Sequence, residues 1–124
     1  MPRYVVVIDW TDEGRKNFAH TRQGYLAAQD ALVATGARFA DIYWTLGEHD
    51  LVGILEADDD EAAAAATLSI SSLGGVRATA TRAFGLDEIQ TVLNRAGDAV
   101  RSLAAAESAE REKIDRVNER MEGR

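Results

Sequence analysis

The residues best suited to chemistry are a histidine and an aspartate that are neighbours in the sequence, His49 and Asp50. An imidazole titrates near neutral pH, so beside a carboxylate it can act as a general acid or base. Adjacent side chains point in different directions, however, and an aspartate in a turn commonly hydrogen-bonds its own backbone. Catalysis and a structural role in a turn are therefore both open for this pair.

A second polar group is Asp9, which interrupts an otherwise apolar stretch from Tyr4 to Trp10. A buried carboxylate needs a charged or hydrogen-bonding partner. Arg77 is a candidate partner, and Thr79 and Thr81 can supply hydroxyl donors. These residues can form a structural ion pair or a site that binds a ligand.

Large aromatic residues, Trp10, Tyr43 and Trp44, occupy expected strand positions. Such residues mostly pack in a core or an interface, but they can also line a pocket for an apolar ligand. The candidates for catalysis are His49 and Asp50. The predicted ligand-binding residues are Asp9, Trp10, Tyr43, His49, Arg77 and Thr79.

Composition excludes several classes of function. The chain has 124 residues, no cysteine and a net charge of -7. The lack of cysteine excludes disulfides, thiolate nucleophiles and cysteine-bound zinc or iron–sulfur centres. Nucleic acid is not an expected partner, because phosphate binding relies on clustered basic residues.

Metal and cofactor motifs are also missing. The histidines, His20 and His49, lie far apart in sequence, and the acidic run from Asp58 to Glu61 lacks the ligand spacing of a calcium loop. Gly74-Gly75 lacks the lysine that follows in a phosphate-binding loop. We therefore expect no metal and no cofactor.

The start of the chain bears on location. It has no signal-peptide pattern, and its apolar run from Val5 to Ile8 is too short to cross a bilayer. We therefore expect a cytoplasmic protein with no membrane partner.

Strand patterns recur along the chain. The stretch Tyr4–Trp10 is apolar on both alternating faces, which indicates a strand covered on both sides. A hairpin is predicted from Phe39–Leu46 and Leu51–Glu56, which flank a polar turn. Val76–Phe84 alternates with a period of two and is the fourth predicted strand.

Two helical segments lie between these strands. The first begins at Thr11 or Asp12, is interrupted near His20-Thr21, where Thr21 can serve as a second cap, and ends at Gly36. The second follows the acidic run, whose carboxylates suit a helix N-terminus, and ends at Gly74-Gly75.

A long terminal helix, with Asp87 as the expected cap, closes the chain. Its apolar residues step by three and four in a heptad register that is broken at Glu107 and Glu110. Six acids and five bases alternate from Glu107 onward, which indicates a solvated helix. The stripe Ile114-Val117-Met121 is either an assembly arm or part of a frayed tail.

The order of elements predicts an α+β fold of the ferredoxin-like βαββαβ type. We expect a four-stranded antiparallel sheet with the helices on one face, followed by the long C-terminal helix. Two helices cover only one face, whereas the first strand and the hairpin are apolar on both. We therefore expect a homodimer with sheets packed face to face, which can assemble further through the C-terminal helix.

Specific motifs occur in three parts of the chain: YVVVIDWTDEG, YWTLGEHDLVGILEADDDEAA and VRATATRAF. Together they resemble the GYD-domain family of small bacterial proteins, over roughly residues 1 to 95. Gly47 and Asp50 match the Gly-Tyr-Asp signature of the family, with Glu48 between them, but His49 stands where the family has tyrosine. What this position does here is therefore open.

The resemblance implies a dimeric α/β barrel. Barrels of this wider superfamily often hold a small molecule between the sheet and the helices or at the dimer seam, although a fold alone grants no function. We predict a GYD-like domain over residues 1–106 and a charged helical extension over residues 107–124.

Three hypotheses for function follow. The first is a homodimer that binds a small molecule or acts as an assembly module. The second is a cofactor-independent oxygenase or isomerase with His49 as acid or base, which requires His49 or Asp9 to point into an enclosed pocket. The third is a scaffold that recruits another protein through the C-terminal helix.

Overall fold

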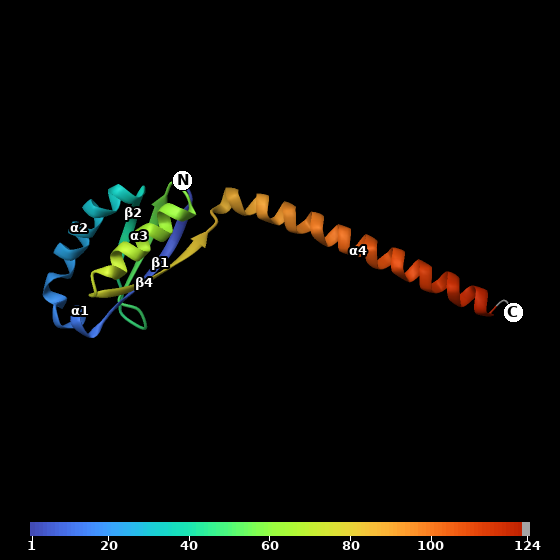
Figure 1. The fold of residues 1–124 in the computed structure, drawn as a ribbon, viewed down its shortest axis with the longest axis horizontal. Helices are drawn as coiled ribbons and strands as arrows, with labels where there is room; N and C mark the ends of the chain where they lie inside the picture. The colour runs from blue at the N-terminus through green and yellow to red at the C-terminus, as the bar shows by residue number, and fades with distance from the viewer. Residues whose placement is uncertain (123–124) are drawn as a thin grey trace. The chain divides into compact units, whose positions relative to one another are not determined.

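The computed structural model describes residues 1–122 and contains a four-stranded antiparallel sheet with the strand order β2-β3-β1-β4 (Figure 1). The central strand β1 pairs antiparallel with both β3 and β4. Together with the helices between the strands, this is the ferredoxin-like order, so the predicted fold class is confirmed. The strands are β1 (Arg3–Trp10), β2 (Ala37–Trp44), β3 (Leu51–Ala57) and β4 (Val76–Ala83).

The first helical segment is broken where the sequence predicts a break. It consists of α1 (Asp12–Lys16), η1 (Phe18–His20), α2 (Thr21–Leu32) and η2 (Val33–Thr35). The Thr11 side chain caps α1 by accepting from the backbone N–H of Gly14. Thr21 is not a cap, because it is the first residue of α2 and its hydroxyl accepts instead from the indole of Trp44. Gly36 ends the segment with a φ of 82°, which glycine adopts without strain.

The acidic run begins the helix α3 (Asp60–Ser72). The carboxylate of Asp59 accepts from the backbone N–H of Ala62 at 2.8 Å, which is an N-cap hydrogen bond. The face of α3 that packs against the sheet is made mainly of alanine, which allows a close approach. Its buried residues are Ala62, Ala63, Ala66 and Ile70.

The hydrophobic core lies between the sheet and these helices. Side chains on one face of β1 and β3 are buried, whereas Val5, Val7 and Ile54 on the other face are only half-buried. One sheet face is thus covered by helices, and we call the other the open face. The buried strand residues are Tyr4, Val6, Ile8, Ala37, Phe39, Leu51, Leu55 and Ala57.

A β-bulge in β2 decides which hairpin residues face the core. The register between β2 and β3 shifts between Phe39 and Asp41, so that Phe39 and Ile42 both lie on the helix side. Tyr43 pairs with Val52 on the open face. The strand ends at Trp44 and not at the predicted Leu46, which is fully exposed in the turn.

The second structural unit, Gly85–Arg124, contains the 37-residue helix α4 (Leu86–Glu122). The helix begins one residue before the predicted cap Asp87, which lies in its first turn. Gly85 takes the cap position, since its carbonyl accepts from Ile89 N–H at 2.9 Å and its N–H donates to Glu88 at 3.2 Å. The helix continues through residue 106 without a break, so the boundary placed there stays a prediction.

Tyr4 provides a test of core stability. Its hydroxyl donates to Asp60 at the start of α3, and burial followed by this hydrogen bond raises the pKa of Tyr4 to about 12. We expect Tyr4→Phe to lower the free energy of unfolding at pH 7 by about 1–2 kcal/mol. The folded-state pKa is raised, so this contribution is complete below pH 10 and is lost as the pH rises towards 12.

Urea denaturation of both proteins between pH 7 and pH 11 measures this difference. The matched control is Tyr43→Phe, because the side chain of Tyr43 is 62% exposed and loss of its hydroxyl should have no effect. A difference between wild type and Tyr4→Phe that stays constant up to pH 11 would show that ionisation of Tyr4 is not coupled to folding.

Candidate functional site

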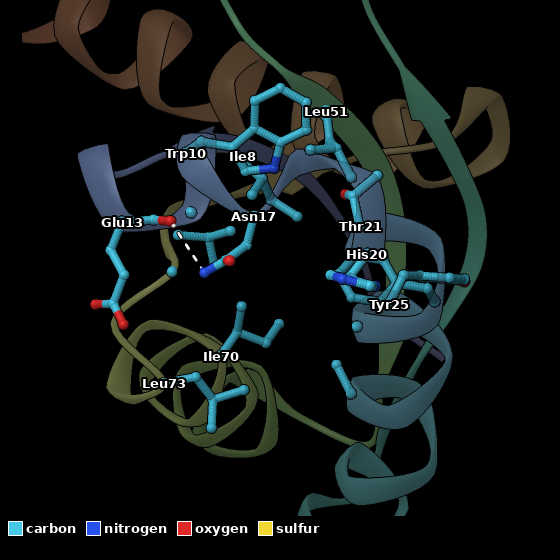
Figure 2. Close-up of a pocket in the computed structure, with 16 residues that line it drawn as sticks. Ile8, Trp10, Glu13, Asn17, His20, Thr21, Tyr25, Leu51, Ile70 and Leu73 are labelled. Atoms are coloured by element: carbon cyan, nitrogen blue, oxygen red, sulfur yellow. Dashed lines mark hydrogen bonds between the residues drawn. The ribbon is translucent and has the colours of Figure 1, made fainter.

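The candidate site is a pocket of about 290 Å³ between the helices and the covered face of the sheet (Figure 2). Ile8 and Leu51 of the sheet and Ile70 of α3 form apolar walls. The polar groups come from the first helical segment. They are Glu13, Asn17, His20 and Thr21.

A close contact between two backbone segments builds one end of the pocket. The hydroxyl of Thr11 donates to the carbonyl of Gly74 at 2.7 Å, and its N–H donates to that of Gly75 at 3.1 Å. A Cβ atom at Gly14 would lie 1.9 Å from the Gly75 carbonyl oxygen. Glycine is therefore required at position 14 for α1 to approach the start of β4 this closely.

Aromatic rings support the opposite wall. The ring centroid of Tyr25 lies 5.9 Å from those of both Phe39 and Trp44, in tilted and edge-to-face arrangements. The Trp44 indole donates to the hydroxyl of Thr21 at 3.0 Å. Burial raises the pKa of Tyr25, so its phenol is neutral at physiological pH. This network connects α2 to β2 and holds the helix against the sheet.

The acidic and basic side chains that line the pocket, Glu13 and His20, lie apart from each other. Figure 2 shows His20 and Tyr25 on one side of the pocket, with Ile70 and Leu73 on the facing side. His20 Nδ1 lies 3.1 Å from the side-chain oxygen of Gln23, a partner that the sequence did not indicate. The carboxylate of Glu13 lies away from His20, at the edge of the view. The pocket therefore does not bring an acid and a base together.

The polar lining was missed from the sequence, although a signal for it exists. Within α2 the lining residues Thr21, Gly24, Tyr25 and Ala28 recur at intervals of three and four, which places them on one face of that helix. This face combines small and polar residues, so it does not stand out as an apolar stripe. In the whole first helical segment the lining residues are Glu13, Gly14, Asn17, His20, Thr21, Gly24, Tyr25 and Ala28.

Of the predicted ligand-binding residues, Trp10 lines the pocket. The others belong to the open face of the sheet or to the turn beside it. Tyr43, Val52, Val7 and Thr79 form one row across the four strands. Asp9 and Arg77 are directly paired in the register of β1 and β4, so both lie on one face, as the predicted partnership requires.

The side chain that contacts Asp9 in the structure is nevertheless that of His49, whose Nδ1 lies 3.1 Å from the carboxylate. Both side chains are more than one-third exposed. Asp50 positions this turn, because its carboxylate accepts from the Trp10 N–H at 2.8 Å and its N–H donates to the Ile8 carbonyl at 3.2 Å. Asp50 therefore has a structural contact, whereas His49 has a carboxylate that orients its imidazole.

Two further findings concern metals and membranes. Within residues 1–122, histidine, aspartate and glutamate side chains do not form a group of three or more that could hold a metal ion. Among the helices that the structure describes, none has the length and apolar character needed to span a bilayer.

The sheet order and the helices on one face define a ferredoxin-like α+β protein with a pocket between sheet and helices. The family model of the GYD domain matches residues 4–93, which is most of the chain. The chain belongs to the GYD domain family, and the resemblance seen in its motifs is confirmed.

Solved structures that are similar to this chain include the crystal structure of TTHA0845 from Thermus thermophilus. It is 25% identical, with 68% of this chain and 95% of that chain covered and a TM-score of 0.44. A dimeric ferredoxin-like protein from an uncultured marine organism is 15% identical, with 69% and 95% covered and a TM-score of 0.42. No curated protein matches the chain.

Proposed function

We propose that this protein is a homodimeric binding protein that holds a small, mainly apolar molecule between its sheet and its helices. The observation that carries the proposal is the pocket of about 290 Å³, with apolar walls and a few polar groups on one side. Ligand sites commonly have this composition, and their volumes begin at about 300 Å³. The size therefore suits a compact ligand.

The lining indicates how such a ligand would be held. An apolar or aromatic body fits against Ile8, Leu51 and Ile70. Asn17 and His20 can each exchange one hydrogen bond with a polar substituent. A charged group is disfavoured in the interior, because the apolar wall offers it no partner.

A binding function fits the pocket better than catalysis does. His49 and Asp9, the groups required by the enzyme hypothesis, do not line it. The oxygenase or isomerase alternative would need its substrate on the open face, where Asp9 orients His49 as a carboxylate orients a general base. Because Asp9 orients His49 in this way, an oxygenase or isomerase activity is our second proposal.

The homodimer rests on the composition of the open face. Its centre is aliphatic, with Val5 and Val7 of β1 beside Val52 and Ile54 of β3. Polar side chains of the two edge strands surround this centre: Asp41, Tyr43, Thr79 and Thr81. An apolar centre with a polar rim is the usual composition of an interface. Packing this face on that of a second copy gives the dimeric α/β barrel, which we place in the cytoplasm.

The pocket proposal is tested with an uncharged fluorescent apolar probe, N-phenyl-1-naphthylamine, and the full chain. Ala28 lines the pocket from α2, so Ala28→Phe fills it and should weaken binding of the probe at least tenfold. Ala27 is exposed on the same helix and does not line the pocket, so Ala27→Phe should bind like wild type. Equal binding by the two variants would place the probe elsewhere and contradict the proposal.

A further inference from the structure

Helix α4 exposes an apolar seam that is interrupted at Glu107 and Glu110. Its large apolar residues other than Val92 occupy the a and d positions of a heptad repeat, and none of its residues that the structure describes is buried. Leu103 is 70% exposed, Val100 63% and Ile114 53%. The a and d positions are Leu86, Ile89, Leu93, Ala96, Val100, Leu103, Glu107, Glu110, Ile114, Val117 and Met121.

Such a seam needs a partner helix. Most of the stability of a helix in water comes from packing its apolar face, and a heptad seam packs best against another heptad seam. We propose that α4 pairs with α4 of a second copy of this chain as an antiparallel two-stranded coiled coil. The proposal goes beyond the pocket and the sheet-face dimer and depends on neither.

The two seam glutamates favour the antiparallel orientation. In a parallel pair each a residue meets its own copy, and so does each d residue. Glu107 would then face Glu107 of the second copy, and Glu110 would face Glu110. The e and g positions beside the seam offer only one acid–base contact to offset this, from Arg111 to Glu110 of the other helix. Like charges would therefore meet at two successive layers.

An antiparallel pair separates these charges. We choose the register in which Ile89 meets Ile114 of the second copy, because it matches the apolar ends of the helix with each other. Leu86 then meets Val117, and Val100 meets Leu103 at the centre. Glu107 lies about 17 Å from Glu107 of the second copy along the axis, at a rise of about 1.5 Å per residue. This exceeds the screening length of about 8 Å at physiological salt.

The centre of this register carries small side chains beside the seam. Gly97 and Ala104 occupy e positions, and Ala99 and Ala106 occupy g positions. In the antiparallel pair these residues face one another across the twofold axis and let the two helices approach closely. The helix begins to carry many charges only after this region, from Glu107 onward.

The seam is complementary to itself under a twofold rotation, which is the reason for proposing a second copy and no other partner. Leu86 and Ile89 near the start of α4 meet Val117 and Ile114 near its end, and each glutamate meets Leu93 or Ala96. An unrelated helix would have to reproduce this order of apolar and acidic layers. A second copy of this chain has this order of apolar and acidic layers already.

Disulfide crosslinking of the full chain tests the proposal, because the native sequence has no cysteine. Ile89→Cys and Ile114→Cys proteins are purified with tags of different mass, mixed and oxidised mildly. We expect a mixed crosslink between the two variants at least tenfold above the control. Ile114→Cys should not crosslink to itself, because in this register the two residues lie about 40 Å apart.

The control is a mixture of Thr91→Cys and Glu112→Cys, which lie at one level of the same register but at outward f positions. A mixed crosslink no stronger than this control would overturn the proposal. Self-crosslinking of Ile114→Cys as the main product would overturn the antiparallel orientation. The crosslinking is repeated in chains that also carry Val7→Asp, which disrupts the proposed sheet-face dimer. Crosslinks that persist in these chains show that α4 pairs without the sheet face, so each interface is tested independently of the other.

Discussion

Gly14→Ala is expected to lower the free energy of unfolding by about 3 kcal/mol, because the added methyl group has no space. A Cβ at this position would lie 1.9 Å from the carbonyl oxygen of Gly75 and 2.8 Å from its carbonyl carbon. These are backbone atoms, so no side-chain rotation relieves the clash. Either α1 or the start of β4 must move, and the hydrogen bonds from Thr11 to Gly74 and Gly75 are lost with that movement.

The measurement is urea denaturation of the full chain, with Gly24→Ala as the matched control. Gly24 also lines the pocket and lies within α2, but a Cβ there meets no atom within 4 Å. Alanine in a helix is favoured over glycine by about 1 kcal/mol, so Gly24→Ala should stabilise the protein by about that amount. If both variants were stabilised alike, α1 would not be held against β4 as described.

Gly14→Ala should also affect the pocket. Gly14 and Gly75 both line it, so separating them widens the end that their contact forms. Stability and ligand binding are therefore coupled at this glycine. In Gly24→Ala the wall stays in place.

The second large effect is expected at the open face, where Val7→Asp should convert dimer to monomer. Val7 lies in the central strand, between Val52 on β3 and Thr79 on β4. In a face-to-face dimer each copy would bury one new carboxylate without a partner. The cost of several kcal/mol corresponds to a dissociation constant raised at least 100-fold.

Light scattering at micromolar concentration measures this change. The chains also carry Val100→Glu and Leu103→Glu, which disable the seam of α4, so that only the sheet face can hold two copies together. The control is Val33→Asp, which makes the same change of side chain as Val7→Asp. Val33 lies in η2, in the helical layer and not on the open face, and its side chain is 72% exposed. The proposed dimer would be contradicted if the chain that carries only the two α4 substitutions were a monomer. It would also be contradicted if Val33→Asp dissociated the dimer as much as Val7→Asp does.

Local patterns in the sequence determined the elements and their order. The β-branched run of β1, the alternation of β4 and the alanines of α3 each form what their composition predicts, because these preferences act over a few residues. The break in the first helical segment before Thr21 and the end of that segment at Gly36 were also predicted from the sequence. The motifs of the first strand, hairpin and closing strand identified the family.

Candidate site residues could be recognised only in part. The sequence indicated Asp9 as a carboxylate in need of a partner, and the strand register does bring Arg77 opposite it. It did not indicate that His49 would contact the carboxylate of Asp9, 40 residues away in sequence. Alternation along the first strand placed Trp10 on one face and Asp9 on the other, but it gave no reason to expect that the face with Trp10 would line a pocket.

Only the tertiary structure decided where the pocket lies. The polar side chains of the first helical segment become a lining only when α1 approaches β4 and α3 packs opposite α2. Likewise, the bulge after Phe39 sets which hairpin side chains face the core. These outcomes depend on contacts between segments distant in sequence, such as Gly14 with Gly75 and Asp50 with Trp10. Periodicity within a single segment carries no information about such contacts, because it reports a residue's face and not what that face will meet.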